Sequence, residues 1–202
     1  MAKRDAKKMY PELYRAPADP VLVEVPPLNY LMIDGEGDPN AETWYRDSVD
    51  ALYAIAYSIK FLVKERDEAL DFVVPPLEGL WWAEDMTAFA EGDRSAWQWS
   101  AMIMMPEPVD EELYLAGHKA ACKKKCLVAA EFMRFEQYEE GLSAQVLHVG
   151  PYADEAPTIE RLHAFIAEQG HKLNGKHHEI YLSDPRKTAA EKLKTILRQP
   201  VG

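Results

Sequence analysis

Long hydrophobic runs are missing from this chain of 202 residues, and basic residues are fewer than acidic ones. The apolar segment 72–82 contains two prolines and a glutamate, and no stretch approaches the roughly 20 apolar residues of a membrane-spanning helix. The formal net charge is −11, and no aromatic face carries concentrated Lys and Arg. We therefore expect neither a membrane nor a nucleic acid as a partner.

Cysteine is also scarce, because only Cys122 and Cys126 occur. Their spacing places both thiols on one side of a helical turn, with His118 one turn earlier. A structural zinc site needs a fourth ligand, so we expect no metal. No glycine-rich loop opens a helix as in phosphate-binding sites, so no cofactor is expected. Residues 1–10 lack the apolar core of a signal peptide, which predicts a cytoplasmic protein.

The hydrophobic pattern predicts the order strand, helix, strand, strand, and it predicts this order twice. Strands of the first round are expected at residues 21–25, 28–33, 72–74, 77–82 and 97–105, around a helix at 42–66. A helix at 110–126 connects the rounds. Strands of the second round are expected at 132–138, 144–149, 179–182 and 193–197, around a helix at 154–169. Residues 139–141 are predicted to form a hairpin turn between the first two of these strands.

Domain organisation follows from these elements. Residues 1–20 hold three prolines that interrupt any helix, so they are expected to be a loosely ordered arm. Residues 21–202 then form a single domain. It divides into module one at about 21–108, a connecting helix at about 109–127 and module two at about 128–202.

Short landmarks recur at matching places in the two rounds. They are glycines at the ends of the first strands and prolines at the ends of the last, namely Gly35, Gly150, Pro106 and Pro200. Aligning 77–81 with 178–182 puts Glu78 and Glu179 in related positions. We infer an α+β fold of duplicated strand-helix-strand-strand modules with pseudo-twofold symmetry. A ligand cleft would lie between the sheet faces that the helices leave free. Chance similarity of two ordinary α+β segments is the alternative.

Glu179 and Tyr181 fall on one face of their strand by alternation. A carboxylate among aromatic side chains can pair with a ligand cation, and the loss of hydration raises its pKa toward that of a base. Tyr152 follows Gly-Pro in a loop that opens a helix, from which its phenol can reach over the end of a sheet. The alternatives are a solvated Glu179 and a Tyr152 that only packs at the helix entry.

Two tryptophans, Trp82 and Trp99, are further candidates for the ligand site. Trp82 shares a strand face with Glu78, and Trp99 shares one with Ala101. Together they can form an aromatic wall for a flat ligand. The alternative is that these tryptophans belong to the hydrophobic core.

Four segments together resemble the stand-alone GyrI-like proteins, namely 75–82, 97–99, 148–152 and 178–185. The resemblance implies a duplicated ligand-binding fold, as in the effector domains of multidrug-responsive transcription regulators. It also implies that Glu179 lies in the ligand pocket. Those regulators carry a DNA-binding helix-turn-helix, which is absent here, so a transcription factor is disfavoured. Some stand-alone relatives are understood to hydrolyse the cyclopropane of DNA-alkylating natural products, whereas others are described as gyrase inhibitors or drug binders.

The sequence therefore leads to one main hypothesis and two alternatives. A detoxifying cyclopropanoid hydrolase would use Glu179 to activate water and Tyr152 to stabilise the developing phenolate. The remaining expected ligand contacts are Glu78, Trp82, Trp99, Tyr138 and Tyr181. The first alternative is a protein that only sequesters flat, hydrophobic, often cationic molecules, which the negative net charge would attract. The second is a gyrase inhibitor that acts through a surface patch. The sequence does not indicate an oligomeric state.

Overall fold

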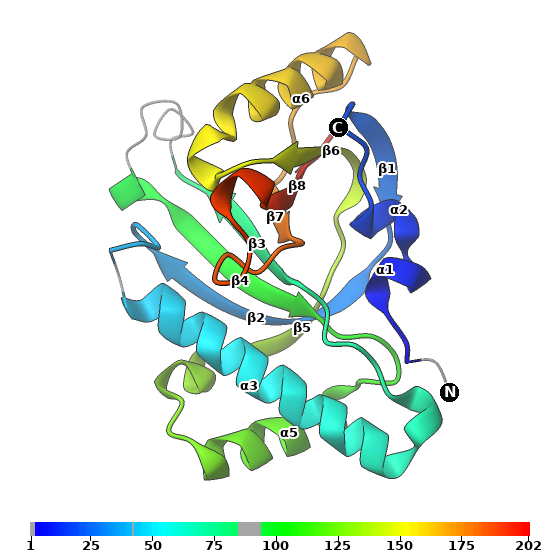
Figure 1. Cartoon of the computed structure of the whole chain (residues 1–202), viewed down its shortest axis with the longest axis vertical. Helices are drawn as coiled ribbons and strands as arrows, with labels where there is room; N and C mark the ends of the chain where they lie inside the picture. Colours follow the sequence, from blue (N-terminus) through cyan, green and yellow to red (C-terminus); the bar gives the residue numbers. More distant parts are fainter. Residues whose placement is uncertain (1–2, 42, 85–93) are drawn as a thin grey trace. The chain divides into compact units, whose positions relative to one another are not determined.

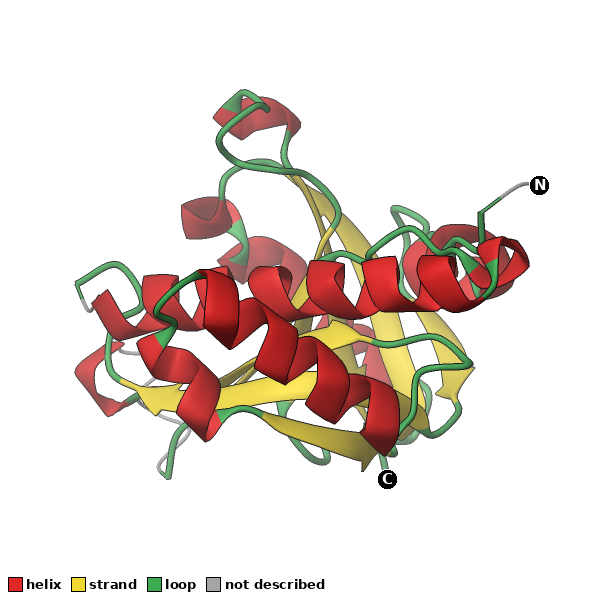
Figure 2. Cartoon of the chain, turned by 90° about the horizontal axis from the view of Figure 1, so that it is seen from below, coloured by secondary structure: helices red, strands yellow, loops and turns green. Residues whose placement is uncertain are grey.

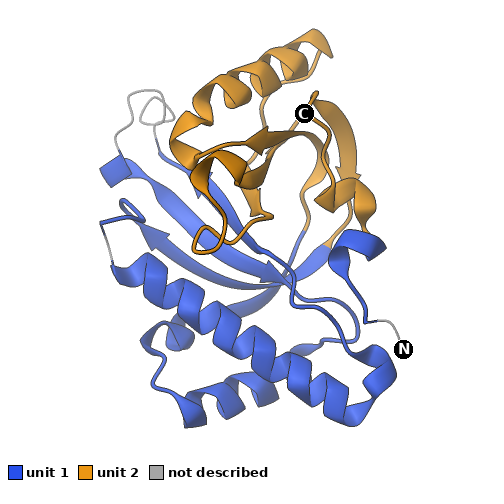
Figure 3. Cartoon of the chain, viewed as in Figure 1, with its two compact units in different colours: residues 1–9, 28–138 blue, residues 10–27, 139–202 orange. Residues whose placement is uncertain are grey.

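The computed structural model describes residues 3–41, 43–84 and 94–202. The chain divides into two compact units, coloured separately in Figure 3. Unit 1 comprises residues 1–9 and 28–138, and unit 2 comprises residues 10–27 and 139–202. Both units combine antiparallel strands with helices, which confirms the predicted α+β class.

Unit 1 is built on four antiparallel strands in the order β3-β4-β2-β5. They are β2 (Leu28–Glu36), β3 (Leu77–Trp82), β4 (Gln98–Met104) and β5 (Arg134–Tyr138). The helix α3 (Thr43–Arg66) buries one apolar stripe that includes Leu52, Ile55 and Ile59, as its periodicity predicts. The helix α5 (Glu111–Lys124) lies beside α3 (Figures 1 and 2).

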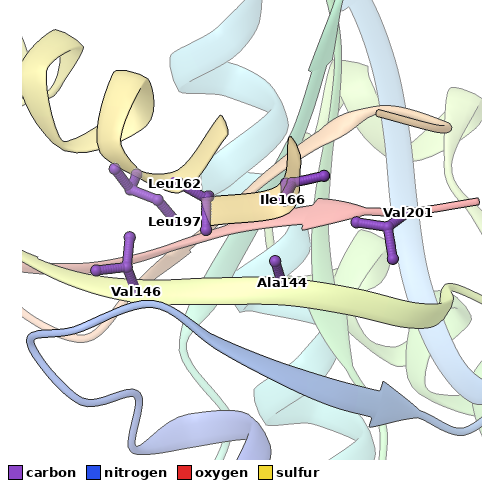
Figure 4. Close-up of a cluster of buried hydrophobic side chains, with 6 residues drawn as sticks. All are labelled: Ala144, Val146, Leu162, Ile166, Leu197 and Val201. Carbon is purple, nitrogen blue, oxygen red and sulfur yellow. The ribbon is translucent and has the colours of Figure 1, made fainter. Parts of the chain in front are cut away.

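Unit 2 repeats this arrangement with β1 (Val21–Val25), β6 (Gly141–Val149), β7 (His177–Tyr181) and β8 (Lys194–Pro200). Their order is β1-β6-β8-β7. The helix α6 (Ala156–Glu168) lies over β6 and β8, and Leu162 and Ile166 pack there against Val146 and Leu197 (Figure 4). Gly170, with a φ of 80°, ends this helix as the sequence predicts.

Several smaller helical elements also occur in the part of the chain that the structure describes. They are α1 (Ala6–Met9), α2 (Pro11–Tyr14), η1 (Glu68–Leu70), η2 (Arg94–Ala96), η3 (Val128–Phe132), η4 (Tyr152–Asp154) and η5 (Ala190–Lys192). Among the described residues, no helix is long and apolar enough to span a membrane.

The strand that precedes each repeat in the chain pairs with a strand of the other repeat. The order strand, helix, strand, strand is confirmed as β2-α3-β3-β4 and as β6-α6-β7-β8. The strand β5 precedes the second repeat but pairs with β2 in unit 1. The strand β1 precedes the first repeat but pairs with β6 in unit 2. The compact units therefore differ from the predicted modules at both strands.

The predicted hairpin at residues 139–141 is wrong for the same reason. Within the described strands, β5 pairs with β2, and β6 pairs with β1 and β8. Gly141 has a φ of 71° and turns the chain, but the strands on its two sides enter different units. A local turn signal does not determine which strand becomes the pairing partner.

The N-terminal segment is ordered over its described part, contrary to the expected loose arm. The side chains of Leu13 and Tyr14 are buried, and the Leu147 amide donates a hydrogen bond of 2.8 Å to the Pro17 carbonyl. The expected strand at 72–74 is reduced to an isolated bridge between Phe72 and Arg4. Long-range contacts order both segments, and a local pattern does not reveal such contacts.

A buried polar network holds Leu13, in the N-terminal segment, within unit 2. Arg198 is 2% exposed and donates to the Leu13 carbonyl at 2.6 Å and to Gln145 Oε1 at 2.9 Å. Its Nη1 lies 3.3 Å from Glu140 Oε2, and His178 Nδ1 lies 3.0 Å from the same oxygen. Burial would raise the pKa of Glu140, but the nearby His178 and Arg198 outweigh that effect and lower it.

Gly35 is required for the packing of Trp99 in unit 1. The two residues face each other across β2 and β4, and a Cβ added at Gly35 would lie 2.1 Å from the Trp99 ring. We expect Gly35→Ala to lower the free energy of unfolding by about 1–3 kcal/mol, because the ring is fully buried and has little room to move. Urea denaturation measures this loss. In a Trp99→Leu background the same substitution should have little effect, and an unchanged loss there would contradict this explanation.

Candidate functional site

The strand β7 presents Glu179 and Tyr181 to the face of unit 2 that α6 covers. Directly paired residues of antiparallel strands point to the same face. Glu179 pairs with Leu197, which packs against Leu162 of α6. Tyr181 pairs with Thr195 on the same face. The shared face of Glu179 and Tyr181 is thus confirmed, but it is the helix-covered face and not the helix-free face that the sequence analysis expected.

The loop before α6 brings Tyr152 to this face. His148 anchors the loop, with its Nδ1 3.0 Å from the Thr158 hydroxyl and its Nε2 3.3 Å from the Pro151 carbonyl. Tyr152 is 40% exposed, and its ring meets that of Tyr181 edge to face at 5.6 Å between centroids. The two phenols therefore lie together at an accessible edge of unit 2.

Glu155 is a second carboxyl on this face and is only 5% exposed. Its backbone carbonyl accepts hydrogen bonds from the amides of Thr158 and Ile159 at 2.9 and 3.0 Å. The start of α6 therefore fixes the position of its main chain. Neither Glu155 Oε1 nor Thr195 Oγ1 completes a hydrogen bond of standard geometry within the described part of the chain.

Electrostatics gives the two carboxyls different proton affinities. Burial raises the pKa of Glu179 to about 7, against the opposing effects of a hydrogen bond from Tyr181 and of nearby His178. Burial and the neighbouring charge of Glu179 raise the pKa of Glu155 to about 9, which the Thr195 hydroxyl offsets only in part. Both carboxyls therefore have raised pKa values, so the pair retains a proton more readily than two ordinary glutamates do.

Tyr152 and His177 both stay neutral at physiological pH. Burial raises the pKa of Tyr152 to about 12, and the charges of Glu155, Glu179 and Asp184 add to this shift. Burial lowers the pKa of His177 to about 3, so its contact of 3.7 Å from Nε2 to Glu179 Oε1 is not an ion pair at neutral pH. Tyr152 therefore remains a hydrogen-bond donor at physiological pH.

Three of the expected ligand contacts lie on one face of unit 1. Glu78 pairs with Met102 and Trp82 with Gln98, both on the face away from α3. Tyr138 lies on that face with Tyr30, at 6.4 Å between ring centroids. Glu78 is 1% exposed. Its role, and those of Trp82 and Tyr138, stay predictions.

Two expectations for unit 1 are corrected. Trp99 faces α3, where it is 1% exposed and packs against Tyr45 at 4.9 Å, so it belongs to the core and forms no wall with Trp82. Glu78 and Glu179 are not equivalent, because Glu78 points away from α3 whereas Glu179 points toward α6. Gly79 points toward the helix-covered face as Glu179 does, so it is the counterpart of Glu179. The alignment of residues 77–81 with 178–182 is therefore displaced by one residue.

Sequence reasoning missed Glu155 altogether. Its only signal was its place two residues before Pro157, at the start of a predicted helix. An acidic residue there is usually solvated and interacts with the helix dipole, so its burial was not apparent. The partners on β8 and β7 that surround it come from distant parts of the sequence.

Cys122 and Cys126 are exposed free thiols. His118 Nε2 lies 3.0 Å from the Ala130 carbonyl, and its Nδ1 lies 3.9 Å from Cys122 Sγ. Within the residues that the structure describes, no group of three or more His, Cys, Asp or Glu side chains is arranged to hold a metal ion. The carboxyl and phenol groups of unit 2 are therefore the strongest candidate site.

Comparisons with known proteins agree with the arrangement of strands and helices. The model of a family of GyrI-like small molecule binding domains matches residues 18–201. An uncharacterized conserved protein from Listeria innocua is 43% identical, with a TM-score of 0.91 over 99% of this chain and 100% of that chain. A structure described as a hydrolase from Listeria innocua is 40% identical, with a TM-score of 0.86 over 99% and 100%. The EcmrR C-terminal domain, at 12% identity and a TM-score of 0.57 over 91% and 97%, shares the fold. No curated protein matches the chain.

Proposed function

The chain belongs to the family of GyrI-like small molecule binding domains, and from this we propose that it binds flat, hydrophobic molecules and hydrolyses cyclopropane-containing DNA-alkylating compounds among them. The observation that carries the proposal is the presence, on one face of unit 2, of Glu179, whose carboxyl is only 15% exposed and has a raised pKa, and of the accessible phenol of Tyr152, whose ring meets that of Tyr181. The 40% identical structure described as a hydrolase supports chemistry in addition to binding. The resemblance to stand-alone GyrI-like proteins suggests the cyclopropane.

The proposed reaction adds one water molecule to an activated cyclopropane. Glu179 accepts a proton from water as the water oxygen forms a bond to a ring carbon. The strained C–C bond of the ring breaks, and its electron pair moves through the conjugated system to the carbonyl oxygen, which becomes a phenolate. The Tyr152 hydroxyl donates a hydrogen bond to that oxygen. Glu179 then releases its proton to solvent and the phenolate takes one from solvent, so the carboxylate is restored and the product contains the atoms of one added water.

The pKa values fit these roles. With its pKa raised to about 7, Glu179 is a stronger base than an ordinary glutamate and is still ionised in a large fraction of molecules at neutral pH. Tyr152, with a pKa raised to about 12, keeps its proton. The rate at low substrate concentration should therefore fall as the pH decreases through about 7.

Binding would rely on aromatic surface and on charge. The rings of Tyr152 and Tyr181 supply an edge-to-face pair against which a planar molecule can pack. The net charge of −11 raises the local concentration of lipophilic cations. Glu78, Trp82 and Tyr138 are proposed as further ligand contacts, on the basis of sequence.

The decisive experiment incubates the purified protein with a cyclopropane-containing DNA alkylator in isotopically labelled water and follows the compound by mass spectrometry. We expect a ring-opened product that carries one labelled oxygen and forms in proportion to protein concentration. Binding of the alkylator and of an aromatic cation is measured in parallel by fluorescence quenching. Saturable binding with no product above the rate in buffer would replace the hydrolase with a sequestering protein.

A further inference from the structure

Cys122 and Cys126 belong to a lysine-rich segment at the end of α5, and the two thiols differ in their neighbours. Cys122 and His118 are four residues apart on the helix and project from the same side of it. Cys122 Sγ lies 3.9 Å from His118 Nδ1. Cys126 lies two residues beyond α5 and, within the described part of the chain, makes no hydrogen bond to an imidazole. Both thiols are exposed, but only Cys122 has a base beside it.

The Ala130 carbonyl determines which nitrogen of His118 carries the proton. His118 Nε2 lies 3.0 Å from this carbonyl oxygen, which can only accept a hydrogen bond. Nε2 is therefore the donor of the neutral imidazole, and the free lone pair belongs to Nδ1. Because Nδ1 is the atom nearest to Cys122 Sγ, the S–H group donates to it. The imidazole is thus in the tautomer that can accept the thiol proton.

The fold holds this imidazole from two sides. The Ala130 carbonyl is fixed in η3, where it also accepts a hydrogen bond of 3.1 Å from the Met133 amide. The Tyr114 ring meets the His118 ring edge to face at 5.9 Å between centroids, and the Tyr114 hydroxyl donates to the Met133 carbonyl at 2.8 Å. A thiol, a base and a carbonyl that orients the base therefore lie in series, which is the arrangement of an activated nucleophile.

The charges and apolar side chains near Cys122 indicate which compounds can react there. The negative end of the α5 dipole disfavours a thiolate, but Lys119 and Lys123 lie within one turn of Cys122 and oppose that effect. Leu115, two turns earlier on α5, and Phe132, at the end of η3, are both exposed. These surroundings favour an uncharged, hydrophobic compound with an electrophilic carbon.

We propose that Cys122 is a nucleophilic thiol, with His118 as its base, that adds covalently to hydrophobic α,β-unsaturated carbonyl compounds. The thiol proton moves to His118 Nδ1 as sulfur forms a bond to the β carbon of the compound. The π electron pair of the C=C bond moves to the carbonyl oxygen, and the resulting enolate takes the proton from the imidazolium. The product is a thioether. Each chain captures one molecule, and no oxidant or further reactant is needed.

This site lies in unit 1, whereas Glu179 lies in unit 2, so the proposal goes beyond the proposed hydrolysis and does not depend on it. Cys122→Ser should abolish the addition and leave the turnover of a cyclopropane unchanged. The failure of one proposal is therefore distinguishable from the failure of the other.

Alkylation by phenyl vinyl ketone, a neutral and hydrophobic enone, tests the site. The ketone is added to the purified protein in less than stoichiometric amount at neutral pH, and peptide mass spectrometry gives the rate of thioether formation at each cysteine. We expect Cys122 to react about tenfold faster than Cys126, a smaller gain than a general base usually provides, because a free thiol is already partly ionised at neutral pH.

A substitution of His118 tests the role of the imidazole. In His118→Gln the rate at Cys122 should fall to about that of Cys126, because glutamine can still donate to the Ala130 carbonyl but is not a base. Thermal unfolding confirms that the variant is folded. In the matched control Cys126→Ser, the rate at Cys122 should not change.

Unfolding separates the effect of the fold from that of the neighbouring lysines. In the urea-unfolded protein the two thiols should react at similar rates, because the contact of His118 with Ala130 is lost whereas the lysines remain. Faster reaction at Cys122 that is lost both in His118→Gln and on unfolding supports the proposal. Equal rates at the two cysteines of the folded wild-type protein would overturn it, and so would a rate at Cys122 that is the same in His118→Gln.

Discussion

Glu179→Gln is expected to reduce the turnover of a cyclopropane-containing substrate by about 10²- to 10⁴-fold, the usual contribution of a general base. Glutamine has almost the same shape as glutamate but cannot accept a proton from water. Because the amide retains hydrogen bonding, the affinity for an uncharged substrate should change little. Single-turnover mass spectrometry gives the rate of water addition, and fluorescence quenching gives the dissociation constant.

Two controls distinguish the role of Glu179 from a general effect of lost charge. Glu160→Gln removes an exposed carboxyl from α6 and should leave turnover unchanged.

The stability of Glu179→Gln should also depend on pH. Because the pKa of Glu179 is raised by folding, its stabilising contribution is complete below the ordinary value of 4.5 and is lost as the pH rises through about 7. The variant should therefore gain stability relative to wild type above pH 7, and unchanged turnover would contradict the proposed base.

Arg198→Met is expected to lower the free energy of unfolding by about 3–5 kcal/mol, the largest loss of stability anticipated for this chain. The guanidinium contacts Glu140, Gln145 and the Leu13 carbonyl within a fully buried network. Its removal leaves the Glu140 carboxylate buried beside His178 without the guanidinium charge. Urea denaturation at pH 7 measures the loss.

A double-mutant cycle identifies the cause of this loss. Arg198→Met combined with Glu140→Gln should cost less than the sum of the single variants, because no uncompensated charge remains. Glu140 has a lowered pKa, so its stabilising contribution is present above pH 4.5 and is lost as the pH falls through its value in the folded protein. Trypsin should cleave faster after Arg15 in Arg198→Met. Strict additivity in the cycle would indicate that the network is not coupled.

The sequence predicted most elements but not the partners of each strand. The apolar period of α3 and α6 and the alternation of β7 are local properties, and these predictions agree with the structure. The pairing of β5 with β2 and of β1 with β6 depends on contacts between residues far apart in the chain. The N-terminal segment is a similar case, because Arg198 and Leu13 are 185 residues apart.

The candidate site shows the same division between local and distant information. Alternation correctly grouped Glu179 with Tyr181, but the covering helix is identified only by the packing of Leu197 against Leu162. The presumed equivalence of Glu78 and Glu179 failed by one residue, enough to reverse the face of a strand. Glu155 was missed because its burial depends on β7 and β8, whereas its local sequence is typical of an exposed helix start.

The pairing of β1 with the distant strand β6 has a consequence for the synthesis of this protein on the ribosome. The strand β1 emerges before the strands of unit 1, but its partner β6 is translated only after them. The nascent chain can therefore complete the four strands of unit 1 while β1 and the segment with Leu13 still lack their partners. Unit 2 can form only when β8 has left the ribosome, so Glu155 and Glu179 are brought together after the strands of unit 1 have been translated.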